Sequence, residues 1–200
     1  MTRLKVWKSF SILVILALVL FLGIAALPMA GTAEASPGTI QVDVNDPSCV
    51  SGSGQSDPYS VVYCSIQAAI DDASPGDTIN VEKGTYEENI NIPEEKGNLQ
   101  LVGEDKETTI ISAPGETGSS GSISLGRVSF EGFTVQFGTT GSQGELGYGI
   151  GLIDASYCII NDNIVTQNQI GIGVIGGEGV SDGEPYDLVS DNNIISGNEI

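Results

Sequence analysis

Apolar side chains recur along this chain in short runs separated by Gly, Asn and Asp, and the runs repeat at a fixed interval of 30 residues. The aligned positions are Val128, Cys158 and Leu188; Val135, Val165 and Ile195; Gly132, Asp162 and Asn192; Phe133, Asn163 and Asn193; and Gly138, Asn168 and Asn198. Internal repeats of this size are typical of solenoids, in which each repeat buries its apolar face against its neighbours.

A shorter interval of 22 residues relates two strand-like runs, Tyr148 to Ile153 and Ile170 to Ile175. Such an interval fits one coil of a parallel β-helix with about three short strands. The eight further residues of the longer interval are expected as insertions, at Thr139 to Leu146 in one coil and near Gly176 to Asp187 in the next. Because parallel strands need an apolar interior, four side chains are predicted to point inward: Ile150, Leu152, Ile172 and Val174.

A single helix is predicted before the repeats, over Ser65 to Ala73, with apolar residues on one stripe, Ser at its start and Pro75 beyond its end. An open coil would expose unpaired strand edges, so this helix is expected to cap the solenoid. Strands are predicted at Thr39 to Val44, Thr78 to Val81, Asn89 to Ile92, Leu99 to Val102 and Thr108 to Ile111.

The repeated Asn residues are predicted to be structural, because Asn tolerates left-handed backbone and stacked amides can bond along a solenoid axis. Asn163 and Asn193 are predicted to be neighbours one coil apart, with Asn168 and Asn198 at another repeated bend. Cys158 aligns with apolar residues and is therefore predicted to be buried.

The remaining cysteines, Cys49 and Cys64, flank a stretch rich in Ser, Gly, Asp and Pro. In an exported chain this arrangement predicts a disulfide. A thiolate metal pair would require C-x-x-C spacing or a histidine, and the sequence contains no histidine.

The first 35 residues have the features of a secretory signal: three basic residues, an apolar core from Ile12 to Leu27 and small residues before Ser36. We therefore expect a secreted or cell-surface protein whose β-helix spans residues 36–200. The core is slightly long for a cleaved signal, so an uncleaved membrane anchor stays open. Any contact with a membrane is expected through this segment alone.

Residues 36–200 contain four basic and 25 acidic residues, a formal net charge of −21. Nucleic-acid binding needs a basic footprint, so this class of partner is excluded. The acidity leaves calcium binding open, and no other cofactor is predicted. The candidate ligands are Asp43, Asn45 and Asp46 in one cluster and Glu178, Asp182, Glu184 and Asp187 in another.

Several stretches together resemble one family of β-helices. They are SIQAAIDDASPGDTINVEKGTYEENINI, LQLVGEDKETTIIS, VSFEGFTV, NDNIVTQN and DNNIISGN. This order is similar to the start of pectin-lyase-like right-handed parallel β-helix proteins, including the NosD-like repeat group, over about residues 39–200. The resemblance implies an all-β, right-handed solenoid with a short N-terminal capping helix. It leaves function open, because the superfamily includes lyases, hydrolases, epimerases, adhesins and surface proteins.

The resemblance also suggests candidate catalytic residues. Pectate-type lyases use calcium and a basic residue, a role for which Arg127 is the candidate in residues 36–200. No second cation accompanies Arg127, and the acidic surface would repel a polyuronate. Related hydrolases use Asp residues near a Gly-His-Gly stretch that this sequence lacks. Asp154 and Asp162 could still form an acid/base pair, although the repeat makes Asp162 a turn residue first.

We therefore predict an exported binding or structural module, with polysaccharide as its expected partner. The alternative is a polysaccharide lyase or glycoside hydrolase of the same fold. Tyr148, Tyr157 and Tyr186 are too scattered to predict a sugar platform and are expected in ordinary packing. Ser196 to Ile200 aligns with Thr166 to Ile170, which precedes a strand. The chain is accordingly expected to be the front part of a longer protein.

Overall fold

The computed structural model describes residues 36–112, 121–124, 127–136, 147–153, 155–176, 178–181, 184–187 and 192–200. Residues 36–200 form one compact unit. The predicted signal segment, the first predicted insertion, Gly138, Asp154, Asp182 and Leu188 lie outside the described residues.

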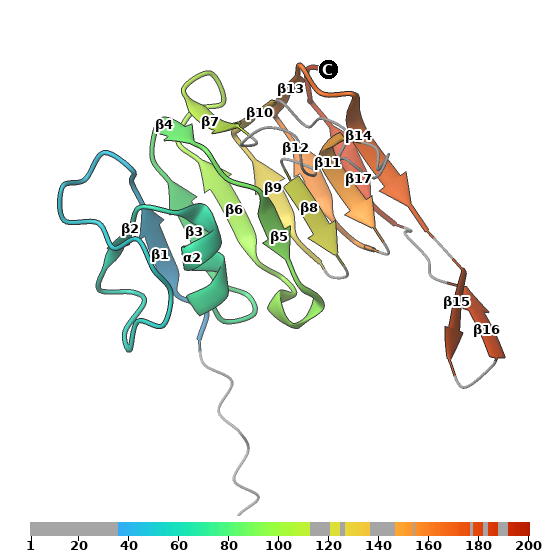
Figure 1. Ribbon diagram of the computed structural model, residues 1–200, viewed down its shortest axis with the longest axis horizontal. Helices are drawn as coiled ribbons and strands as arrows, with labels where there is room; N and C mark the ends of the chain where they lie inside the picture. The colour runs from blue at the N-terminus through green and yellow to red at the C-terminus, as the bar shows by residue number, and fades with distance from the viewer. Residues whose placement is uncertain are drawn as a thin grey trace, which may run out of the picture. The chain divides into compact units, whose positions relative to one another are not determined.

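Three parallel sheets run the length of this unit, with strands of successive coils side by side (Figure 1). Sheet A contains, in spatial order, β17 (Ile194–Ser196), β12 (Ile159–Asn161), β9 (Ser129–Glu131), β6 (Gln100–Gly103), β3 (Thr78–Val81), β1 (Thr39–Val42) and β2 (Val62–Tyr63). Sheet B contains β13 (Ile164–Thr166), β10 (Thr134–Gln136), β7 (Thr109–Ser112) and β4 (Gly84–Tyr86). Sheet C contains β14 (Ile170–Ile175), β11 (Tyr148–Ile153), β8 (Gly121–Ser124) and β5 (Ile90–Ile92).

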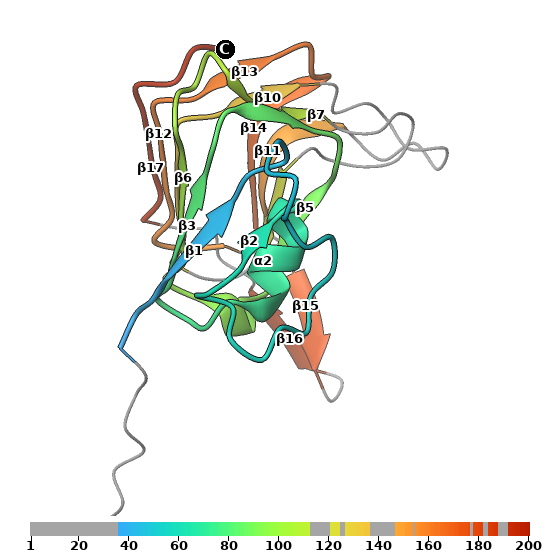
Figure 2. The same ribbon diagram turned by 90° about the vertical axis from the view of Figure 1, so that its left-hand side faces the viewer.

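The chain visits sheets A, B and C in turn, so the predicted parallel β-helix is confirmed (Figure 2). All five strands predicted before residue 113 are present, with bounds within two residues of those expected. The two-residue β2 and the three-residue β4 were not predicted, because runs this short carry little periodic signal. A 3-10 turn, η1 (Glu94–Lys96), follows β5.

Inward side chains stack in columns from coil to coil. On sheet A the column is Ile79, Leu101, Phe130 and Ile160, all buried. On sheet C Ile150 and Leu152 are buried as predicted. Ile172 and Val174 pair with these two residues, but Ile172 is only partly buried and Val174 is 46% exposed. The reason is that β14 pairs on one side only among the described strands.

The predicted capping helix is present as α2 (Ile66–Asp72), which lies across the end of the coils in Figure 2. Ser65 caps it by accepting a hydrogen bond from the Ala68 N–H at 3.2 Å. Glu88 accepts further bonds from the N–H groups of Ile66 and Gln67, at 2.8 and 3.0 Å. The helix buries Ile66, Ala69 and Ile70 against the first coils, which removes their apolar area from water.

The spacing of the repeats is only partly as predicted. Val135 pairs with Val165 at the interval of 30, and Ile150 pairs with Ile172 at the interval of 22. Ile195, however, pairs with Ile160 and not with Val165. The coil that separates Asn163 from its partner Asn198 is 35 residues long, because it contains an antiparallel pair, β15 (Glu178–Ser181) and β16 (Glu184–Asp187).

This longer coil corrects the alignment of the last segment. Ser196 lies beside Asn161, and Glu199 forms a bridge with Ile164. The segment Ser196 to Ile200 is therefore not aligned with Thr166 to Ile170 as expected.

Candidate functional site

The predicted asparagine residues occupy three different corners. Asn163 is fully buried, and its side-chain oxygen accepts a bond from the Phe133 N–H at 3.1 Å. Asn198 stacks on it one coil later, where its oxygen accepts bonds from the Asn163 N–H and side-chain amide, both at 3.0 Å.

The predicted Asn163–Asn193 stack is therefore wrong. Asn193 instead accepts a 2.8 Å bond from the Cys158 N–H at the start of sheet A. Asn168 lies between sheets B and C and donates to the carbonyls of Val135 and Thr166. These amides bind backbone groups, which is a structural use of Asn.

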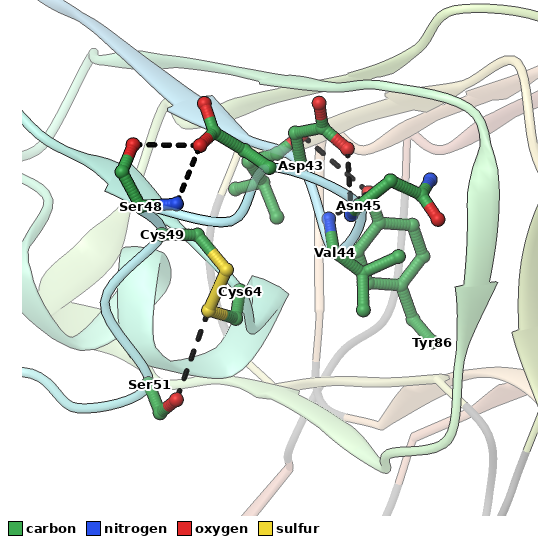
Figure 3. The surroundings of a disulfide bond; sticks show 10 residues. Asp43, Val44, Asn45, Ser48, Cys49, Ser51, Cys64 and Tyr86 are labelled. Atoms are coloured by element: carbon green, nitrogen blue, oxygen red, sulfur yellow. Dashed lines mark hydrogen bonds between the residues drawn. A yellow bond between two sulfur atoms is a disulfide. The ribbon is translucent and has the colours of Figure 1, made fainter.

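The cysteines also divide into two kinds. Cys49 and Cys64 form a disulfide with their Cα atoms 5.1 Å apart, and the Ser51 hydroxyl lies 3.7 Å from the Cys64 sulfur (Figure 3). Cys158 is buried and lies outside this disulfide, and burial raises the pKa of its thiol. A protonated buried thiol is a poor nucleophile, so Cys158 is a packing residue.

Two carboxylates hold the loop that leads into the cap. Asp77 is fully buried and accepts bonds from the N–H groups of Gly38 and Ser74 and from the Tyr59 hydroxyl. Asp72 accepts bonds from the N–H groups of Gly54 and Gln55 and from the Tyr63 hydroxyl, at 2.6 to 2.8 Å. All of their described partners are donors from the protein, so both groups serve the fold.

The pKa of Asp72 reflects two opposing effects. Burial raises it, but the N–H groups of Gln55 and Gly54 together with the Tyr63 hydroxyl and the nearby Lys96 charge outweigh burial and leave the pKa below its usual 3.8. The carboxylate is therefore charged when its loop is ordered.

Asp162, predicted as one half of an acid/base pair, lies at the turn after β12 with a left-handed φ of 51°. Its carboxylate contacts Lys106 at 2.8 Å, and Lys106 also contacts Glu199 at 2.9 Å. Hydrogen bonds to these two carboxylates raise the pKa of Lys106. Asp162 is thus a turn residue with a cationic partner.

Arg127, predicted as a lyase base, lies at the opposite end of sheet A from Asp162. Arg127 precedes β9, while Asp162 follows the neighbouring β12. Its guanidinium lies over the ring of Tyr157, 5.1 Å from the ring centroid. The structure does not bring these two candidate residues together.

The candidate calcium ligands are not gathered into a site that the structure describes. Glu178 pairs with Asp187 and Glu184 with Ser181 across the β15–β16 ladder. Within the described residues no group of three or more acidic, Cys or His side chains could hold a metal ion. Asn45 bonds to the Asp43 carboxylate through its own N–H, and Asp46 accepts from Ser48, so both lie in local turns.

Comparison with known proteins shows which of them this chain resembles. Residues 48–139 match the family model Pectinesterase. This match begins in the cap loop and continues past β10. The chain is a parallel β-helix that is similar to pectinesterases over this segment. The resemblance predicted from the sequence is confirmed at this level, while membership of the NosD-like group stays a prediction.

One curated pectin-lyase-like relative is "Pectinesterase/pectinesterase inhibitor 18" of Arabidopsis thaliana, 37% identical over 79 residues. The aligned stretch covers 40% of this chain and 14% of that protein. A solved structure, "Pectin methylesterase from Carrot", matches with a TM-score of 0.48 and 16% identity, over 68% of this chain and 41% of that one. In the described part of the chain no helix has the length and apolar character to cross a membrane.

Proposed function

We propose that this protein acts on a polysaccharide, with a methyl-esterified polyuronate as its substrate and ester hydrolysis as its reaction. The observation that supports this proposal is the Pectinesterase match, which extends from the cap through β10. It favours the enzyme alternative over the binding module that we predicted first. Ester hydrolysis also replaces lyase and glycosidase chemistry as the preferred reaction class.

The positions of Arg127 and Asp162 also argue against lyase and glycosidase chemistry. A lyase base must accept a proton from the substrate, but the Arg127 guanidinium is a charged donor that lies over the Tyr157 ring, at the opposite end of sheet A from Asp162. A glycosidase acid must hold its proton near neutral pH. Asp162 instead lies at a turn, where its carboxylate contacts Lys106 at 2.8 Å. On our proposal neither residue carries out the chemistry.

Charge supports an esterified substrate. A methyl ester of a uronate is neutral, whereas the product of its hydrolysis is a carboxylate. Residues 36–200 carry a formal charge of −21, so the surface repels a polyanion more strongly than its neutral ester. The protein would accept the substrate and release the product.

We further propose that the protein is exported. The segment formed by residues 1–35 has the features of a secretory signal. The disulfide between Cys49 and Cys64 is of a kind that persists in oxidising compartments. Polysaccharides of this type are met outside the cell, so the two proposals are consistent.

The test is to incubate the full chain with highly methylated pectin, polygalacturonate and a neutral glucan. Released methanol, unsaturated products, new reducing ends and retained protein are measured in parallel. We expect methanol from the methylated pectin without unsaturated products or new reducing ends. Retention without methanol would restore the binding module, unsaturated products would indicate a lyase, and new reducing ends a glycosidase.

A further inference from the structure

A column of left-handed residues precedes the strands of sheet A. Its members lie two residues before the strands of four coils and have positive φ angles: Gly76 at 89°, Asn98 at 64°, Tyr157 at 60° and Asn192 at 55°. Arg127 holds the matched position before β9. Gly and Asn tolerate this conformation, whereas for a bulky side chain it is uncommon and costs energy. Such strain is often kept at functional sites. Tyr157 therefore needs a reason beyond the turn.

The Tyr157 side chain is 53% exposed, and Arg127, its neighbour in the preceding coil, lies over its ring. Arg127 is the one arginine in residues 36–200. The described lysines bind protein oxygens: Lys83 contacts Glu104, Lys106 contacts Asp162 and Glu199, and Lys96 donates to the carbonyls of Asp71 and Ala73. Among the described cations, Arg127 and Lys96 have no described carboxylate within salt-bridge distance, and Lys96 donates instead to two backbone carbonyls.

Two isoleucines extend this surface along the outer face of sheet A. Ile159 and Ile194 are paired on β12 and β17, and they are 42% and 55% exposed. Because side chains alternate along a strand, Ile159 on β12 faces outward while Ile160 after it is buried. Tyr157 is exposed at the turn that leads into this strand. We call Arg127, Tyr157, Ile159 and Ile194 the Tyr157 platform; β12 and β17 lie side by side in Figure 1.

We propose that the Tyr157 platform binds a uronate residue within an otherwise neutral, esterified polysaccharide. The apolar face of a pyranose ring fits against the tyrosine and isoleucine side chains. The guanidinium fork of Arg127 pairs with the ring carboxylate through two parallel hydrogen bonds. This ligand rests on the proposed function.

The net charge limits how many carboxylates the ligand can carry. One arginine can pair with one uronate, while every further carboxylate is repelled by a surface of net charge −21. A fully esterified chain lacks the carboxylate that Arg127 would bind. The Tyr157 platform should thus bind a sparsely charged polyuronate more tightly than either a fully esterified or a fully de-esterified chain.

The experiment measures binding of the full chain to oligogalacturonides of low, intermediate and complete methyl esterification by calorimetry. We expect the intermediate preparation to bind best. Arg127→Gln and Tyr157→Asn should each weaken that binding about ten-fold, since each removes a charge-assisted or stacking contact. Lys83→Gln is the matched control, because it removes one exposed cation elsewhere and should change affinity less than about two-fold.

Folding failure would not obscure the result, because Tyr157→Asn introduces the residue that Asn98 and Asn192 already place in the same column. Equal affinity of both variants and the parent, or strongest binding to fully de-esterified material, would overturn the platform. Methanol release with unchanged binding by the variants would refute the platform and leave the proposed function standing. Variant-sensitive binding without methanol release would support the platform and refute ester hydrolysis.

Discussion

Asn163 shows how a single side chain joins successive coils. Its amide donates to the carbonyls of Phe130 and Asn161, and its oxygen accepts from the Phe133 N–H. Backbone groups at a sharp corner cannot all pair within sheets, and a buried unpaired group is costly. The Asn163 amide pairs with three of these groups.

Asn163→Ala should lower the free energy of unfolding by about 2–3 kcal/mol, because it leaves several buried backbone groups unpaired. Asn161→Ala is the control, since its side chain accepts one exposed bond from Ser196 and its loss should cost about 0.5 kcal/mol. Urea unfolding of both variants measures the difference. Equal losses would contradict a special role for Asn163.

Tyr157→Asn should raise the free energy of unfolding by about 0.5–1 kcal/mol. The change relieves left-handed strain, and this gain exceeds the loss of an exposed cation–π contact. Comparing the thermal unfolding of the variant and the parent protein shows whether the variant is more or less stable. A clear loss of stability would show that Tyr157 is kept for packing and not for binding.

At the scale of elements, the cap depends on bonds that tie an irregular loop to a short helix. The loop passes from β1 to α2 through the disulfide and meets the helix at Asp72. A seven-residue helix is too short to be stable by itself. Its order therefore depends on these contacts and on its buried apolar face.

Replacing both Cys49 and Cys64 by Ser should cost about 3 kcal/mol, the loop entropy expected for a separation of 15 residues. Cys158→Ala should cost much less, because it shortens one buried side chain without opening a loop. Peptide mapping after alkylation checks the pairing in the parent protein. A disulfide that includes Cys158 would contradict it.

Lowering the pH should destabilise the cap, because it protonates the Asp72 carboxylate. Its folded pKa lies below the ordinary value of 3.8, so its stabilisation is complete above that value and is lost as pH falls through the folded pKa. Asp72→Asn should reduce the fall in stability between about pH 5 and pH 2. Unfolding curves across this range provide the measurement, and an unchanged pH slope would exclude the carboxylate as a cause.

At the scale of the whole molecule, stability should vary along the solenoid axis. Interior coils pair on both sides, whereas β14 and β17 pair on one side among the described strands. In a solenoid each coil is stabilised mainly by its nearest neighbours. The last coil therefore has about half of the supporting contacts of an inner one.

Hydrogen exchange should show this gradient directly. Amides of β17 and β14 should exchange faster than those of β3 and β6, because they open without the unfolding of the inner coils. Mass spectrometry of peptic peptides from the full chain at neutral pH gives the comparison. Uniform protection from β3 to β17 would indicate a single cooperative unit.

The sequence by itself determined the features that depend on local pattern. Alternating apolar residues predicted β3, β6 and β7, and a capped apolar stripe predicted α2. The 22-residue interval between β11 and β14 was visible because that coil contains no large insertion. Such signals are read within a few residues of each other, so no distant contact is needed to find them.

Only the tertiary structure decided which coils lie in register and which side chains meet. The β15–β16 pair lengthens one coil, so Asn198 and not Asn193 stacks on Asn163. The Lys106–Asp162 contact joins residues 56 apart, and the Tyr157 platform depends on three neighbouring coils. The two repeat intervals indicated an insertion near Gly176 to Asp187, but the eight residues they gave it are too few for the 35-residue coil. Backbone hydrogen bonds between strands set the register of every later residue.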